Sequence, residues 1–254
     1  LQTGSLGNPN PSNNPSTWGS SVIDVLFTVE GEYFISMIIE NICGPDTLTK
    51  KVCIVPEPIA SFDLDTTSGC VPLEVNAANT SNSLTDCVAA AYTWDVQLLV
   101  PSCGYPSSWS FINGTNPGSV HPSFSINNPG QYVVSLQVIN KCNSIAFSDT
   151  INVKAPPQVT ASAIPDFCDS ASITPSAIYD SCSGFITSYN WGFVGGSPAS
   201  SVNEIPGTIS YPTDGIYNIT IDATNACGTS SDVISFTITK SPNITMPLGD
   251  SLCF

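Results

Sequence analysis

The feature that most constrains this chain is one block of residues that occurs three times. The block begins Gly-x-Tyr and ends Asn-x-Cys, and it spans 31–43, 130–142 and 215–227. The Tyr-to-Cys spacing is ten residues in every copy. Apolar residues recur at every second position along 132–138, which is typical of a strand with one face in a core. A repeat of this kind predicts a tandem array of similar domains.

The spacing of the blocks indicates the size of each domain. Their tyrosines, Tyr33, Tyr132 and Tyr217, lie 99 and 85 residues apart, the length of an immunoglobulin-like sandwich. The Gly-x-Tyr start fits a tyrosine corner, in which a Tyr near the start of strand F hydrogen-bonds back to the chain. With 21 Pro, 18 Gly and no sustained helical period, we predict an all-β fold of tandem immunoglobulin-like β-sandwiches in an elongated array. Trp94 and Trp191 are expected in the cores, on strand C.

Proline-containing junctions predict where the domains begin and end. Proline fixes φ and lacks an N–H, so it ends strand pairing and stiffens a link. Such junctions occur at 56–58, 155–157 and 241–242. The domains expected are the C-terminal part of one repeat (1–56), a complete repeat with an insertion near 97–120 (57–155), a second complete repeat (156–241) and the start of a further repeat (242–254). The chain is therefore expected to be a segment of a longer protein.

Eight of the ten cysteines recur at repeat-related positions, which predicts disulfides and an oxidising, extracytoplasmic setting. They fall into a set that ends the block, a set that precedes the Trp strand and a set that follows the first strand. These sets are, in that order, Cys43, Cys142 and Cys227; Cys87 and Cys182; and Cys70, Cys168 and Cys253.

The pairing of these cysteines follows from the ends of a sandwich at which they lie. The loop before strand C and the loop after strand F share one end, which favours Cys87–Cys142 and Cys182–Cys227. Cys70 would lie at the opposite end, roughly 20 Å away at about 3.3 Å per strand residue. That distance exceeds disulfide reach, and it makes Cys70–Cys103 a candidate pair within the second repeat. The alternative is Cys70–Cys142 together with Cys168–Cys227.

Composition argues against several functions. The 20 acidic and 5 basic residues give a net charge of −15, which opposes binding to nucleic acid or anionic lipid. No apolar run approaches the length that spans a membrane. The one histidine, His121, precedes a predicted strand, and no Gly-x-Ser-x-Gly elbow or phosphate loop occurs. We expect no catalytic residues and no enzyme activity.

Two groups of residues are candidate binding sites. Asp63 and Asp65 share one face of a strand and could bind Ca²⁺ together with Glu57 at a domain junction; no other cofactor is expected. Tyr105 and Trp109 lie in the insertion, where aromatic rings could stack on sugars. The alternative is that Trp109 covers the edge of the sandwich.

These residues resemble PKD domains, which are immunoglobulin-like repeats. The resemblance lies in 129–140 and in the motifs Tyr92-Thr93-Trp94-Asp95 and Tyr189-Asn190-Trp191-Gly192, and it covers essentially the whole chain. The family usually continues Trp-Asp-Phe-Gly-Asp-Gly, from which 96–97 and 194–196 depart. The Cys-bearing form is similar to PKD arrays in very large surface proteins of the Bacteroidota, of the gliding-motility adhesin type exported by type IX secretion.

This resemblance implies a non-catalytic structural repeat segment of a long extracellular, cell-surface adhesin or filament, used for surface attachment and gliding motility. The implied partners are neighbouring repeats, cell-surface motility or anchoring machinery, and extracellular polysaccharide. The alternative is an accessory or polysaccharide-binding PKD module of a secreted hydrolase. The tripeptide Asp-Ser/Thr-apolar also resembles the O-glycosylation signal of that group, and it occurs at Thr47, Thr150, Ser170 and Ser251.

Overall fold

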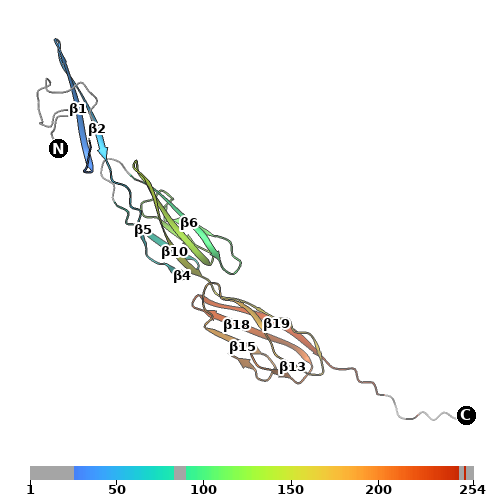
Figure 1. Ribbon diagram of the computed structural model, residues 1–254. Coiled ribbons are helices and arrows are strands. Elements are labelled where there is room, and N and C mark those ends of the chain that lie inside the picture. Colours follow the sequence, from blue (N-terminus) through green and yellow to red (C-terminus); the bar gives the residue numbers. More distant parts are fainter. Residues whose placement is uncertain (1–25, 83–89, 246–248, 250–254) are drawn as a thin grey trace.

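The computed structural model describes residues 26–82, 90–245 and 249, and within them it consists of strands joined by turns and loops, with no helix. Figure 1 shows a β-hairpin, a middle sandwich and a C-terminal sandwich that follow one another along a single axis. In the described ranges, no helix has the length and apolar character needed to cross a membrane. The predicted all-β, tandem immunoglobulin-like architecture is confirmed, while the exact domain bounds stay a prediction.

The middle sandwich consists of two four-stranded sheets, ordered β4-β10-β9-β6 and β3-β5-β8-β7. Its strands are β3 (Phe62–Leu64), β4 (Ser68–Cys70), β5 (Leu73–Asn79), β6 (Ala91–Pro101), β7 (Trp109–Ile112), β8 (Ser123–Ile126), β9 (Gly130–Ile139) and β10 (Ser144–Lys154). Alternate residues of β9 face inward, and Tyr132, Val134, Leu136 and Val138 are fully buried. The period of two seen in the sequence is therefore the inward face of strand F.

The C-terminal sandwich has one five-stranded sheet, ordered β12-β19-β18-β15-β16, and two smaller pairs, β11-β14 and β13-β17. Its strands are β11 (Gln158–Ala161), β12 (Phe167–Cys168), β13 (Ala171–Ile173), β14 (Ala177–Asp180), β15 (Ser188–Phe193), β16 (Ser200–Ser201), β17 (Ile209–Tyr211), β18 (Gly215–Asn225) and β19 (Gly228–Thr239). It has its own core of buried residues, which includes Trp191, Tyr211 and Ile221.

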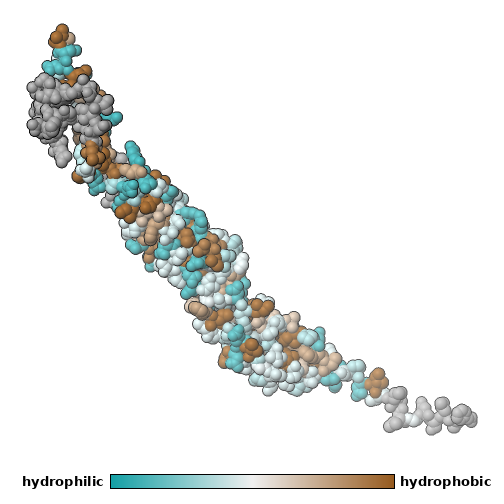
Figure 2. Space-filling view, in the orientation of Figure 1, coloured by the Kyte–Doolittle hydropathy of each residue, from teal (hydrophilic) through white to brown (hydrophobic). Residues whose placement is uncertain are grey.

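The hairpin at the N-terminal end repeats the last two strands of each sandwich. It is formed by β1 (Gly31–Asn41) and β2 (Gly44–Ile54). Its register matches theirs, since Tyr33 lies opposite Val52 just as Tyr132 lies opposite Ile151. Several of its apolar residues are exposed, and Figure 2 shows apolar surface over this region; they are Phe34, Met37, Ile39 and Leu48.

The three block tyrosines form the predicted tyrosine corners. In each, the hydroxyl donates a hydrogen bond to the carbonyl four residues earlier: Tyr33 to Val29 at 2.9 Å, Tyr132 to Asn128 at 3.0 Å and Tyr217 to Thr213 at 2.8 Å. A buried phenol needs such a partner, so the repeated Tyr has a structural role. Burial raises the pKa of Tyr132.

The two predicted core tryptophans are confirmed on β6 and β15. Trp94 is 2% exposed, donates its indole N–H to the Ser119 carbonyl at 2.9 Å and packs edge-on against Phe62. Trp191 is fully buried and stacks on Phe193. Each sandwich therefore has the tryptophan of strand C at its centre, as expected of this fold.

Candidate functional site: the braced junction

Two disulfides join the middle sandwich to the C-terminal sandwich. Cys70, in β4 of the middle sandwich, bonds Cys227 in the turn between β18 and β19, with Cα atoms 5.4 Å apart. Cys103, in the turn after β6, bonds Cys182, which follows β14, with Cα atoms 5.1 Å apart. Both bonds therefore cross the junction around the linker, residues 155–157.

Strand pairing beside the linker positions the first bond. β4 runs parallel to the end of β10, and Cys70 lies opposite Lys154, the last residue before the linker. The amide of Val71 donates to the Lys154 carbonyl at 2.8 Å, which fixes Cys70 at the lower edge of the middle sandwich. On the other side, the Cys227 amide donates to the Asn225 side-chain oxygen at 2.8 Å, so the Asn-x-Cys turn is closed by its own Asn.

Asn225 also clamps the linker directly. Its side chain is buried, and its amide nitrogen donates to the Ala155 carbonyl at 2.7 Å and to the Ser181 carbonyl at 3.3 Å. The Ala155 amide in turn donates to the Cys182 carbonyl at 3.1 Å. The backbone of the linker is thus held on both sides by the C-terminal sandwich, as a buried polar backbone requires.

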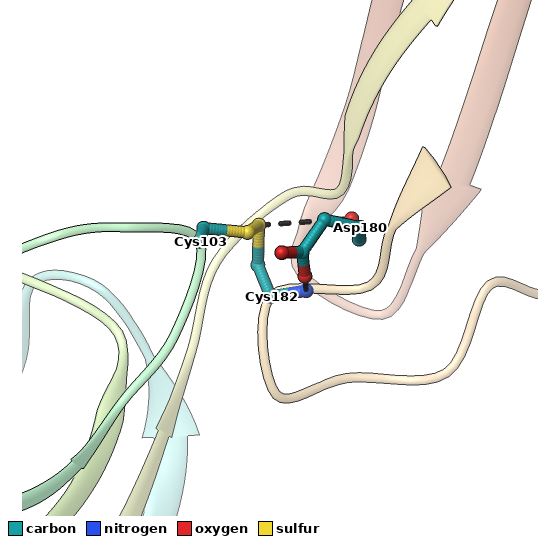
Figure 3. Close-up of side chains that lie close together, drawn as sticks. All are labelled: Cys103, Asp180 and Cys182. Carbon is teal, nitrogen blue, oxygen red and sulfur yellow. Dashed lines mark hydrogen bonds between the residues drawn. A yellow bond between two sulfur atoms is a disulfide. The ribbon is translucent and has the colours of Figure 1, made fainter. Parts of the chain in front are cut away.

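The second bond lies in a tight pair of turns, drawn in Figure 3. The Asp180 carboxylate accepts a hydrogen bond from the Cys182 amide at 3.0 Å, and the Cys182 sulfur lies 3.7 Å from the Asp180 carbonyl. Both cysteines have left-handed backbone angles, with φ of 52° at Cys103 and 51° at Cys182. Within the described ranges, these three residues are the one group of potential metal ligands close enough together to share an ion. Both sulfurs, however, form the disulfide and are not available as thiolate ligands.

The predicted disulfide pairing is wrong. Cys182–Cys227 and Cys70–Cys103 do not form, because each of these cysteines has a partner in the neighbouring sandwich. Cys87–Cys142 and the alternative Cys70–Cys142 and Cys168–Cys227 do not form either, because Cys142 and Cys168 are free and exposed. Cys87 and Cys253 lie outside the described residues.

The physical reason lies in how the ends of the sandwiches meet. Cys70 and Cys142 do lie at opposite ends of the middle sandwich, next to the two ends of the β9–β10 pair. The lower end of that sandwich, however, abuts the upper end of the next one. The short distance is therefore the one between sandwiches, which a prediction made one domain at a time does not include.

The calcium candidates do not converge in the described structure. Asp65 directs both carboxylate oxygens to Asn76, at 2.9 Å to its amide and 2.7 Å to its side chain. Asp63 is exposed beside it in a shallow depression that His121 also lines. Among the described residues, neither aspartate forms a group of three close ligands with Glu57.

The two aromatic candidates, Trp109 and Tyr105, lie in different environments. Trp109 is half-buried in β7, where its ring meets Phe111 edge-on at 5.2 Å and packs against the middle core. Tyr105 is 41% exposed in the preceding loop. The structure thus gives Trp109 a packing role at the sandwich edge, whereas Tyr105 is exposed at the surface.

The glycosylation candidates are accessible where the structure describes them. Thr47 and Thr150 lie exposed on β2 and β10. The backbone amide of each threonine donates a hydrogen bond to the carboxylate of the aspartate that precedes it, at 2.9 Å for Thr47 and 2.7 Å for Thr150. Ser170 is exposed after β12. Ser251 lies outside the described residues.

Sequence reasoning missed the role of the asparagine in the Asn-x-Cys turns. Asn140 repeats the geometry of Asn225, since its amide nitrogen donates to the Pro56 carbonyl at 2.8 Å. The signal was present, because the asparagine recurs with the cysteine in every block. In the two sandwiches, the asparagine of the Asn-x-Cys turn thus hydrogen-bonds the linker that precedes its own sandwich.

Comparisons with known proteins find tandem immunoglobulin domains. No protein-family model matches the chain, and no curated protein matches it. Among solved structures, it is similar to a three-immunoglobulin variant fragment of titin, with 13% identity, a TM-score of 0.42, and coverage of 84% of this chain and 75% of that one. It is also similar to the mouse nectin-like molecule 4 ectodomain, with 14% identity, a TM-score of 0.40, and coverage of 76% and 67%.

Proposed function

We propose that this chain is a non-catalytic structural segment of a long extracellular surface filament, and that its work is to extend, stiffen and bear tension. The observation that supports the proposal most is the pair of disulfides between successive sandwiches, Cys70–Cys227 and Cys103–Cys182. Two covalent bonds on different sides of a linker restrict both bending and twisting, because one bond alone would still permit rotation about itself.

The linker and the charge fit the same role. Pro157 is buried, and Asn225 binds the linker backbone, so the joint has little freedom even apart from the disulfides. The net charge of −15 favours solubility of a long exposed array. Disulfides of this kind persist in oxidising compartments, which supports an extracellular setting.

The finer form of the proposal follows the resemblance to PKD arrays of gliding-motility adhesins. In that form the filament belongs to a cell-surface adhesin exported by type IX secretion, attaches the cell to a surface and is moved by separate motility machinery. Neighbouring repeats are its direct partners. The polysaccharide-binding alternative has less support, because the Trp109 ring packs against the middle core.

Joint stiffness is the property to measure. Spin labels placed at the exposed positions Ser110 and Thr229, one in each sandwich, would report the distance distribution between the sandwiches. We expect one narrow distribution for the oxidised chain and a broader one after reduction. A distribution that is equally broad in both states would contradict the proposal of a stiff segment. Labelling of intact source cells with an antibody to residues 57–241 tests the surface location separately.

A further inference from the structure

The free cysteines of the two sandwiches occupy the same positions as the bonded pair. Cys168 corresponds to Cys70, since each lies in a short strand parallel to the end of the last strand of its sandwich. Cys70 lies opposite Lys154, and Cys168 lies opposite Thr239. The residue after each cysteine also makes the same hydrogen bond. The Asp169 amide donates to the Thr239 carbonyl at 2.9 Å, and the Val71 amide donates to the Lys154 carbonyl at 2.8 Å.

Cys142 corresponds in the same way to Cys227. Its amide donates to the side-chain oxygen of Asn140 at 2.8 Å, the same closure that Asn225 gives Cys227. Its sulfur lies 3.3 Å from the Val55 carbonyl. Val55 is the counterpart of Lys154, because each lies one residue beyond the partner of the block's first glycine.

The position of the Cys142 sulfur is therefore informative. At the braced junction, the residue opposite Lys154 is Cys70, which bonds the turn cysteine. At the junction between the hairpin and the middle sandwich, the turn cysteine is Cys142, and its sulfur lies against the equivalent carbonyl, that of Val55. Cys142 is thus positioned to form a disulfide with a cysteine that would lie, like Cys70, in a short strand beside the end of the preceding domain.

We propose that Cys168 and Cys142 are the two complementary halves of a repeating inter-sandwich disulfide, so that one sandwich of this type presents Cys168 to the Asn-x-Cys turn of the sandwich that follows it. The partner is a sandwich of this chain's kind joined in tandem through a linker of the same length. This inference rests on the junction geometry and does not depend on the proposed surface role.

The bond forms by oxidation with a disulfide-class oxidant, such as oxidised glutathione. The two thiols lose two protons and two electrons as their sulfur–sulfur bond forms, and the oxidant's own sulfur–sulfur bond is reduced to two thiols. Both cysteines are exposed, so the oxidant can reach them. Backbone register then brings the two thiols together without a change in either sandwich.

A head-to-tail duplication tests the proposal. Residues 1–241 are followed directly by residues 58–254 of a second copy, so that Pro58 takes the place of Pro242 and the linker keeps its length. The chain is refolded in a glutathione redox buffer and its disulfides are mapped on unreduced peptides. We expect Cys168 of the first copy bonded to Cys142 of the second, at an occupancy comparable with that of Cys70–Cys227.

The matched variants separate register from chance. In Cys168→Ser of the first copy, Cys142 of the second copy should stay reduced while Cys70–Cys227 still forms. Cys43 is an internal competitor, since it is exposed on the same kind of turn. The proposal is overturned if Cys168 stays reduced, if it pairs as often with Cys43, or if Cys70–Cys227 itself is absent, because the equivalence depends on that bond.

Discussion

The nested topology of the two disulfides predicts how the chain lengthens under force. Cys70 and Cys227 are separated by 157 residues, and the Cys103–Cys182 loop of 79 residues lies inside that span. When the chain is pulled from its ends, tension passes across the outer bond. Most of both sandwiches, residues 71–226, is then shielded, even after every strand has unfolded.

The magnitudes follow from these separations. At about 3.3–3.6 Å per extended residue, the 157 shielded residues represent about 520–565 Å of hidden length. Cys70→Ser opens the outer loop but leaves the inner one closed, so it releases the difference of 78 residues, or about 260–280 Å. Cys103→Ser alone releases nothing, because the outer bond still carries the tension. The double variant releases the full hidden length.

Single-molecule pulling of the chain between terminal handles measures the released length as an increase in the final contour length. Every variant carries Cys53→Ser, because Cys53 is itself disulfide-bonded and would add a loop. We expect the reference chain and Cys103→Ser to have the same, shortest contour length. Cys70→Ser should be longer, and the double variant should be the longest. A gain from Cys103→Ser alone would refute the reasoning, since separate bonds within each sandwich would give additive gains instead of nested ones.

Three further predictions concern single side chains. Asn225→Ala leaves the buried Ala155 carbonyl without its partner and should lower the free energy of unfolding by about 1–3 kcal/mol in denaturant titration; an unchanged midpoint would contradict the clamp. Tyr217→Phe removes the hydrogen bond to Thr213 and should cost about 0.5–1.5 kcal/mol by the same measurement, with no cost arguing against the corner. Burial raises the pKa of Tyr179 to about 12 from 10.0, so its stabilising effect is full below pH 10 and lost as pH rises toward 12; the phenolate absorbance that develops at the highest pH should have a smaller amplitude in Tyr179→Phe, and an unchanged amplitude would refute the assignment.

The fold was predictable because its signals are local and repeated. The period of two in 132–138 fixes which face of β9 is buried, and the Gly-x-Tyr start fixes the corner that begins the strand. Trp94 and Trp191 could be placed on strand C because each ends the same Tyr-x-Trp motif. Each of these features depends on contacts within one sandwich, which is why one copy of the repeat suffices to infer them.

The braced junction could not be predicted in the same way, because its contacts join residues of different domains. Cys70 and Cys227 are far apart in sequence, and their meeting depends on how one sandwich is seated on the next. Cys70 does lie far from the turn of its own sandwich, and its partner is the turn of the sandwich that follows. Asn225 was overlooked for the same reason, since its partner Ala155 lies in the linker.

Mapping the disulfides of the oxidised chain on unreduced peptides is the most direct test of the central claim, that successive sandwiches are covalently braced. We expect peptides that link Cys70 to Cys227 and Cys103 to Cys182, each joining sequence from both sides of the linker. Peptides that link Cys182 to Cys227 or Cys70 to Cys103 would place the bonds within single sandwiches. That result would contradict the braced junction and the stiffness inferred from it.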